Sequence, residues 1–168
     1  QQTRLRSMAL VQAIADGSSD AIFAKDLAGR YLLCNVSAAK AIGQPPEQVL
    51  GQDDRALFQP ETAAVIEAND RLTLNANRVQ TYDETIRTVS GTVTFLSTRG
   101  PLRDEQGRVV GVWGISRDIS ERKRLDDELQ AHRHHLLELV DERTRELTRL
   151  NQELSVARDH AESANVAK

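Results

Sequence analysis

Four histidines, one cysteine and two adjacent acidic pairs are the side chains of this 168-residue chain best suited to chemistry. The acidic pairs, Asp53-Asp54 and Asp126-Asp127, lie in predicted helices, where consecutive side chains diverge instead of converging on one site. No glycine-rich phosphate loop, nucleophile elbow or metal-ligand spacing accompanies them. We therefore expect no enzyme activity and no metal site in this chain by itself. The histidines are His132, His134, His135 and His160, all in its last third.

Composition narrows the class of protein further. The net charge of −3 gives no reason to expect nucleic acid as a partner. One cysteine, Cys34, excludes an intramolecular disulfide and is compatible with a reducing compartment. No apolar run reaches the length of a membrane span. We expect a cytoplasmic module without direct membrane contact, in a parent protein that can still be anchored to a membrane elsewhere.

Two kinds of structure must position these residues. Up to about residue 117, short strand patterns and short helix patterns alternate, separated by turn residues. Two hairpin-linked sets of strands with helices between them predict an α+β domain, a five-stranded antiparallel sheet with small helices on one face. The predicted helices are 4–16, 36–42, 46–50, 53–58 and 60–75, and the predicted strands are 21–25, 30–34, 78–88, 91–103 and 109–117.

The change from sheet to helix is predicted at the segment Asp118-Ile119-Ser120-Glu121-Arg122. An aspartate three residues before a glutamate has the spacing of a capping box. Asp118 is therefore expected to cap the following helix and to pair with Arg122 or Lys123. Such a stiff connection is what transmission of a small shift in the sheet to a long helix requires.

Residues 120–168 contain no glycine or proline and repeat apolar residues at heptad spacing, with one four-residue insertion near Leu136. One helix with such a stripe needs a partner, and a second copy in a parallel coiled coil is the simplest. His132 and Arg143 are polar core positions that either fix the register or keep the coil marginal, and His132 is in addition a candidate proton-sensitive layer. The predicted coil core is Leu125, Leu129, His132, Leu136, Val140, Arg143, Leu147, Leu150 and Leu154.

About residues 8–124 resemble a PAS domain, the small sensory module of many signalling proteins. The resemblance is carried by Asp20 to Gly29 running into Arg30 to Asn35, by Ala41 to Gly43, by Val49 to Gly51, by Pro101 to Gly107 and by Gly114 to Arg124. Asp118-Ile119-Ser120 resembles the junction at which PAS domains pass to an effector helix. The resemblance implies an N-terminal helix at 1–17, a sensory domain at 18–119 and a signalling helix at 120–168.

The resemblance also implies where a ligand would lie, between the sheet and the small helices, with Cys34, Asn35, Tyr82, Phe95 and Trp113 as candidate lining residues. Two alternatives stay open for this space: it binds a small ligand of unknown identity, or it is filled by side chains of the core. No cofactor is predicted. Residues 1–131 contain no histidine for haem, and 51–58 lacks the cysteine that flavin-binding relatives use.

The functions that follow are those of a signalling module. The end of the chain resembles the run that leads into the phosphoacceptor helix of hybrid-type histidine kinases. This implies a homodimer through the coil, with a kinase in cis and a response regulator as the parent's partner. For the N-terminal helix, packing on its own domain, a second dimer contact and a connector from an upstream domain all stay open. The alternatives are a constitutive dimerising spacer without ligand and an input module of a cyclic-dinucleotide enzyme.

Overall fold

The computed structural model describes residues 2–167, with the side chains of residues 6–167. Its centre is a five-stranded antiparallel sheet, as predicted, and the strands lie in the order β2-β1-β5-β4-β3. The first and last strands of the sequence, β1 and β5, are therefore neighbours in the middle of the sheet. The strands are β1 Ala21–Asp26, β2 Tyr31–Cys34, β3 Gln80–Thr88, β4 Gly91–Arg103 and β5 Val109–Asp118.

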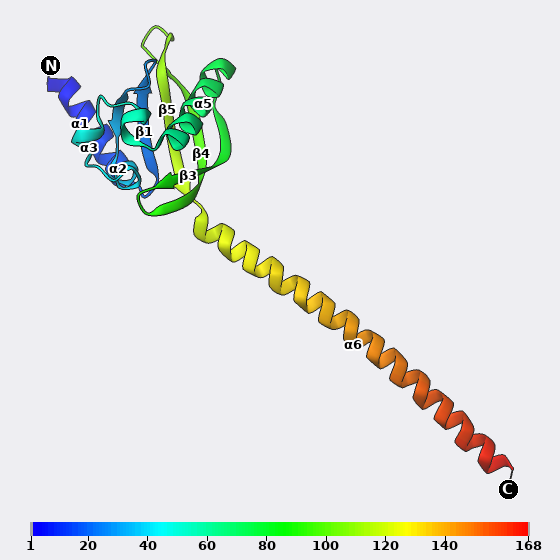
Figure 1. Ribbon diagram of the computed structural model, residues 1–168. Helices are drawn as coiled ribbons and strands as arrows, with labels where there is room; N and C mark the ends of the chain where they lie inside the picture. Colours follow the sequence, from blue (N-terminus) through cyan, green and yellow to red (C-terminus); the bar gives the residue numbers. More distant parts are fainter. Residues whose placement is uncertain (1, 168) are drawn as a thin grey trace. The chain divides into compact units, whose positions relative to one another are not determined.

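Small helices lie over one face of the sheet (Figure 1). Asn35 caps α2 by accepting a hydrogen bond from the Ala38 backbone N–H, and Gly43 ends the helix in the left-handed region at φ 85°. Asp53 caps the single turn of α4 through the Ala56 N–H. The helices are α1 Gln2–Asp16, α2 Val36–Ile42, α3 Pro46–Val49, α4 Asp54–Leu57 and α5 Pro60–Ala76.

The core lies between this helical layer and the sheet. Phe23 and Tyr31 pack with the alanines of α2, while Phe95 and Ile86 pack against Ile66 of α5. Gly114 on β5 faces the same layer, because a Cβ there would lie 2.3 Å from the Phe23 ring. The absence of a side chain at this position thus leaves the space that the Phe23 ring occupies.

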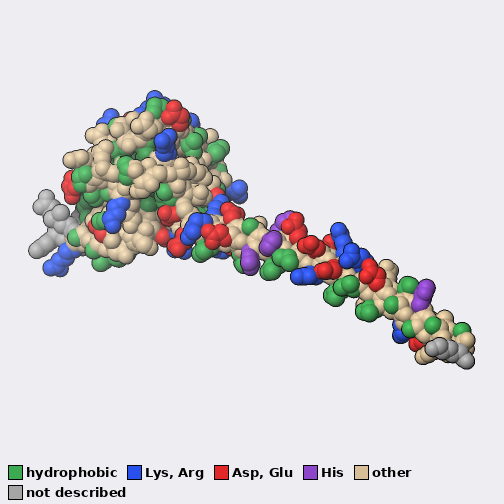
Figure 2. Space-filling model, turned by 60° about the horizontal axis from the view of Figure 1, so that its bottom comes forward, with side chains coloured by type: hydrophobic (Ala, Val, Ile, Leu, Met, Phe, Trp, Pro, Cys, Tyr) green, Lys and Arg blue, Asp and Glu red, His purple; other side chains and the backbone are tan. Residues whose placement is uncertain are grey.

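The last helix, α6 Ser120–Val166, is 47 residues long and has no buried side chain. The chain divides into two compact units, residues 1–121 and 122–168. Along α6, apolar side chains alternate with charged ones (Figure 2), and ion pairs one turn apart such as Arg124–Glu128 stabilise the helix. Among residues 2–167, no helix combines the length and apolar character that a bilayer span requires.

Candidate functional site

A cluster of five charged side chains is buried between the sheet and the helices α4 and α5. Lys25 comes from β1, Asp54 from α4, Asp70 from α5, Glu84 from β3 and Arg99 from β4. None of the five is more than 8% exposed. Charged side chains are rarely buried to this degree unless they are paired, so the cluster is the most unusual feature of the domain.

Lys25 joins the two aspartates of the cluster. Its Nζ lies 2.6 Å from Asp54 Oδ2 and 2.8 Å from Asp70 Oδ2, and its side chain is fully buried. The same ammonium lies 5.3 Å from the centroid of the Phe23 ring and 4.8 Å from that of Tyr31. Ion pairing and cation–π contacts together replace the water that Lys25 loses on folding.

Arg99 joins α5 to β3 on the other side of the cluster. Its Nη1 donates to Asp70 Oδ1 and its Nη2 to Glu84 Oε1, the latter over 2.6 Å. Glu84 also accepts from the Ser97 hydroxyl over 2.8 Å and from the Asn69 amide over 2.9 Å. Burial alone would lower the pKa of Arg99, but the two carboxylates raise it above the ordinary value, so the guanidinium stays charged.

The hydrogen bonds continue from this cluster into β5. The Ser97 and Ser116 hydroxyl oxygens are 2.8 Å apart, and both side chains are buried. Ser116 lies two residues before Asp118, the last residue of β5. A continuous set of hydrogen bonds therefore runs from α5 across β3 and β4 to the end of the strand that precedes α6.

Asp54 is the member of the cluster whose ionisation is least supported. Burial raises its pKa above the ordinary value, although Lys25 acts in the opposite direction. Tyr31 donates its hydroxyl hydrogen to Asp54 Oδ1 over 2.9 Å. Burial and the neighbouring Asp54 carboxylate raise the pKa of Tyr31 well above its ordinary value, so Tyr31 stays a neutral donor.

A small apolar cavity of about 50 Å³ lies between the sheet and α2. Ligand pockets for drug-sized molecules usually enclose several hundred Å³, so this cavity is small by comparison. Glu84, Arg99 and Ser116 form its polar side. Its apolar walls are formed by Ala21, Phe23, Tyr31, Ala38, Ala41, Ile42, Phe58, Ile66, Ile86 and Phe95.

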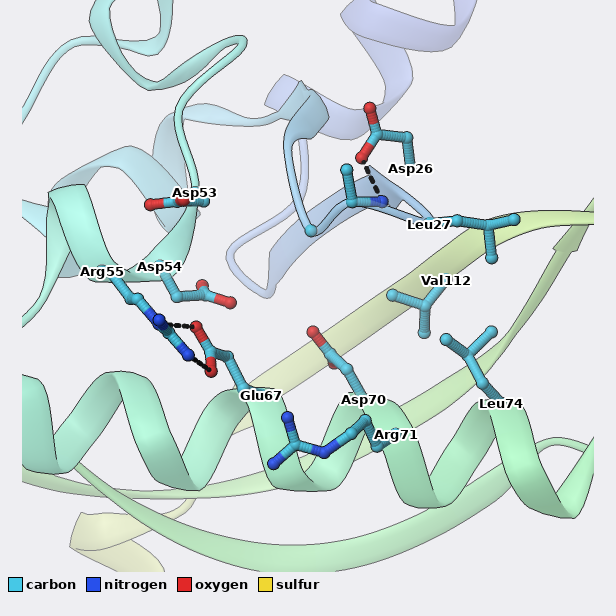
Figure 3. A pocket seen from close by; sticks show the side chains of 12 residues that line it. Asp26, Leu27, Asp53, Asp54, Arg55, Glu67, Asp70, Arg71, Leu74 and Val112 are labelled. Carbon is cyan, nitrogen blue, oxygen red and sulfur yellow. Dashed lines mark hydrogen bonds and ion pairs between the residues drawn. The ribbon is translucent and has the colours of Figure 1, made fainter.

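A larger cavity of about 420 Å³ lies at the turn between β1 and β2, against α4 and α5. In Figure 3 the carboxylates of Asp54, Glu67 and Asp70 point toward the same space. Glu67 is paired with Arg55, whose Nε lies 2.9 Å from Glu67 Oε1. The inner wall of this cavity therefore includes two members of the buried cluster. Among the described residues, no group of three or more His, Cys, Asp or Glu is arranged to hold a metal ion.

Of the five residues predicted to line a ligand pocket, Phe95 alone lines the apolar cavity. Tyr82 is half-buried with its ring 5.9 Å from the Arg99 guanidinium carbon, and burial raises its pKa to about 12. Trp113 differs from the prediction, because it lies on the opposite face of β5 from the cavity. Its indole covers Gly100, where a Cβ would lie 2.6 Å from the ring. Side chains alternate along a strand, so Trp113 cannot share the face of its neighbour Gly114.

The other two predicted residues have structural positions. Cys34 is buried in the apolar cluster around Phe23, and burial raises the pKa of its thiol to about 11. Both polar atoms of the Asn35 side-chain amide form hydrogen bonds to the backbone. Its Oδ1 accepts from the Ile22 and Ala38 N–H groups, and its Nδ2 donates to the carbonyls of Ala15 and Asp20. Asn35 thus joins the end of α1, the start of β1 and the start of α2.

The junction before α6 is held by β4 as well as by β5. The Thr94 N–H of β4 donates to the Ser120 hydroxyl over 2.9 Å, and the Ile119 N–H donates to the Thr94 carbonyl over 2.9 Å. The Asp118 carboxylate accepts a hydrogen bond from the Ser120 N–H, two residues further along the chain. This contact is an Asx turn and differs from the predicted capping box, in which Asp118 would pair with Glu121. Pairing of Asp118 with Arg122 or Lys123 stays a prediction.

Sequence reasoning missed the charged cluster entirely. In the sequence, each member of the cluster resembles an ordinary solvent-exposed charged residue of a strand or helix. The five positions are spread over 75 residues, from Lys25 to Arg99. One available signal was strand alternation, because Lys25 follows Phe23 at the two-residue spacing of one strand face. That signal marks Lys25 as inward-facing, but it does not identify the partners from α4 and α5.

Comparison with known proteins agrees with this geometry. A family model described as "PAS fold" matches residues 15–124. The chain is 34% identical over 118 residues to the methanogenesis regulatory histidine kinase FilI of Methanothrix harundinacea, covering 70% of this chain and 13% of FilI. It is 26% identical over 121 residues to the aerobic respiration control sensor protein ArcB of Escherichia coli K12, covering 71% of this chain and 16% of ArcB.

The fold also matches solved structures. The PAS domain of BvgS from Bordetella pertussis aligns with a TM-score of 0.55 at 22% identity, covering 77% of this chain and 98% of that domain. This likeness concerns the fold of the sensory region. The matched region spans 13% of the length of FilI and 16% of the length of ArcB. From the family match and the identity to FilI, this chain belongs to the PAS family.

Proposed function

We propose that this chain is the sensory and dimerisation module of a sensor histidine kinase. In this proposal a state of the PAS domain passes through a parallel dimeric coiled coil to a kinase domain beyond residue 168, and the parent protein phosphorylates a response regulator. The similarity to the PAS regions of FilI and ArcB supports the signalling context. The observation that carries the proposal is the long α6 that starts directly at the end of β5.

The exposed apolar side chains of α6 support the dimer. Leu129, Leu147 and Leu154 are each more than 60% exposed in the single helix. Monomeric proteins rarely leave a continuous apolar stripe in water, and a second α6 would cover it at the predicted core positions. Arg143, a predicted core position, lies along its own helix and contacts Glu146 over 2.7 Å. Its guanidinium can therefore stay at the edge of the coil interface.

The junction supports transmission to α6. Ser120 is bonded to Thr94 of β4 and follows Asp118 of β5, so the start of the helix is attached to two adjacent strands. A relative shift of these strands would therefore change the direction of the first helical turn. The hydrogen bonds from the charged cluster reach Ser116 on the same strand.

We also propose that the domain works without a large cofactor. The space between sheet and helices is occupied by the side chains of the charged cluster, and the remaining apolar cavity is about 50 Å³. This same observation favours a second candidate, a constitutive dimerising spacer that holds effector domains at a fixed distance and binds no ligand. The two candidates differ in whether the packing of the junction controls output.

Cysteine cross-linking tests the parallel coil. In a background with Cys34→Ser, Leu147→Cys should form an interchain disulfide quickly, because a parallel coil places the two copies of a core residue side by side. Arg145→Cys is the matched control, two residues away on the outer side of the helix. Equal cross-linking of the two variants would contradict the proposed interface.

Autophosphorylation of the intact parent protein tests the sensor. Ser120→Ala removes the acceptor for the Thr94 N–H and should change kinase output while circular dichroism shows a folded domain. The control, Thr81→Ala, removes a surface contact with Thr98, which lies four residues along β4 from Thr94. Unchanged output with Ser120→Ala would favour the spacer.

A further inference from the structure

The buried cluster contains an unequal number of charges. Three carboxylates, Asp54, Asp70 and Glu84, face two cations, Lys25 and Arg99, when all five are ionised. This leaves one net negative charge in the interior. An uncompensated charge in a site of low polarity is strongly unfavourable, so the folded protein gains from any source of one further positive charge.

The hydrogen bonds show which of the three carboxylates has the fewest donors to stabilise its negative charge. Glu84 accepts from the Arg99 guanidinium, a serine and an asparagine. Asp70 accepts from both cations, Lys25 and Arg99. Asp54 shares the Lys25 ammonium with Asp70, and its other oxygen accepts only from the neutral Tyr31 hydroxyl. The excess negative charge therefore belongs mainly to Asp54.

Asp54 also has a route to solvent. It lines the cavity of about 420 Å³, which is bordered by exposed residues of the β1–β2 turn. Burial favours the neutral form of its carboxyl, with the pKa raised in consequence. The charged and titratable groups around it are Lys25 and Asp26 from β1, Tyr31 from β2, Arg99 from β4, Glu67, Asp70 and Arg71 from α5, and Asp53 and Arg55 beside it in sequence.

We propose that Asp54 is a proton-binding site, and that its proton is the missing positive charge which keeps α4 packed against the sheet. The proton sits on Oδ1, so the Tyr31 oxygen, whose hydroxyl donates to Oδ1 in the structure, becomes the acceptor of this hydrogen bond. Lys25 keeps its pairing with Asp70. Loss of the proton restores the excess charge and weakens the attachment of α4, a single turn from Asp54 to Leu57. This inference goes beyond the proposed function and does not depend on it, since it concerns the domain itself.

Carboxyl-carbon NMR of the whole chain tests the proposal during a titration from pH 3 to pH 8. One aspartate should titrate clearly above the ordinary value of about 3.9. The backbone amides of Ala56 and Leu57 should shift with the same midpoint. In Asp54→Asn, the raised titration and the amide shifts should both disappear.

Asp53→Asn is the matched control, because asparagine keeps the α4 cap that Asp53 provides while removing a neighbouring exposed carboxylate. It should leave the raised titration in place. The proposal is overturned if every aspartate titrates at or below the ordinary value, or if the raised titration persists in Asp54→Asn. If Asp54→Asn does not fold, the test uses the backbone amides of α4 in the unmodified chain. The proposal is overturned if their chemical shifts do not change with a midpoint above the ordinary pKa of aspartate.

Discussion

Replacing Lys25 by methionine should strongly destabilise the sensory domain. Lys25 is fully buried and its Nζ contacts Asp54 and Asp70 over 2.6 and 2.8 Å. Methionine fills a similar volume but supplies no charge, so both aspartates lose their shared cation. With all carboxylates ionised, the formal charge of the cluster changes from −1 to −2, and with the proposed proton on Asp54 it changes from 0 to −1.

The magnitude follows from the burial of the pair. Removing one partner of a buried ion pair costs about 3–5 kcal/mol, because the remaining charge is left uncompensated. An exposed pair costs about 0–1 kcal/mol. The matched control is Arg55→Met, since Arg55 is 76% exposed where it pairs with Glu67. We therefore expect Lys25→Met to lower the free energy of unfolding by several times the loss in Arg55→Met.

The pH dependence of this loss has a definite sign. The pKa of Asp54 is raised by burial, so the folded state binds its proton more tightly than the unfolded chain does. The stability that this proton contributes is complete below the unfolded pKa of about 3.9 and is lost as the pH rises through the folded pKa. Without Lys25, the folded pKa rises further. The loss in Lys25→Met should therefore be larger at pH 7 than at pH 5.

Urea unfolding followed by the fluorescence of Trp113 measures these differences, since Trp113 is the only tryptophan and lies on β5. The double variant Lys25→Met/Asp54→Asn removes one positive and one negative charge, and it should recover part of the lost stability. If Lys25→Met loses no more free energy of unfolding than Arg55→Met at either pH, the buried cluster does not stabilise the fold as described.

Three further predictions concern single positions in the domain. The Cys34 thiol, with its pKa raised to about 11 by burial, should react with iodoacetamide at pH 8 only after urea unfolds the chain, and rapid labelling of the folded protein would contradict this burial. Gly114→Ala should cost about 1–3 kcal/mol in urea unfolding because its Cβ meets the Phe23 ring, and an unchanged midpoint would show that the ring moves aside freely. Ser120→Ala should cost about 1 kcal/mol and speed hydrogen exchange of the Thr94 amide, whereas unchanged exchange would mean that the junction bond is not formed in solution.

The order of strands and helices could be predicted from the sequence because the signals are local. Asn35 caps α2 and Gly43 ends it, and both residue types are favoured at those positions for reasons of backbone geometry. The alternation of apolar residues likewise marks the strands. These signals depend only on residues that are close in the sequence, so they can be recognised without knowledge of the tertiary fold.

The charged cluster could not be predicted, because its members meet only through the fold. Lys25 pairs with Asp54, 29 positions away, and with Asp70, 45 positions away. The placement of Trp113 failed for a related reason, since a nearly continuous apolar run on β5 hides which face each residue takes. The change from strand to helix falls within the predicted segment 118–122, since β5 ends at Asp118 and α6 begins at Ser120, but the contact of Ser120 with Thr94 depends on the pairing of β4 with β5.

The proposed function requires that two copies of α6 pair and connect the PAS domains to an effector. Light scattering of the whole chain at micromolar concentration tests it most directly. The account predicts twice the 18.7 kDa mass of one chain. A mass of one chain over the whole concentration range would contradict it, because the leucines of α6 would then remain in water without a partner.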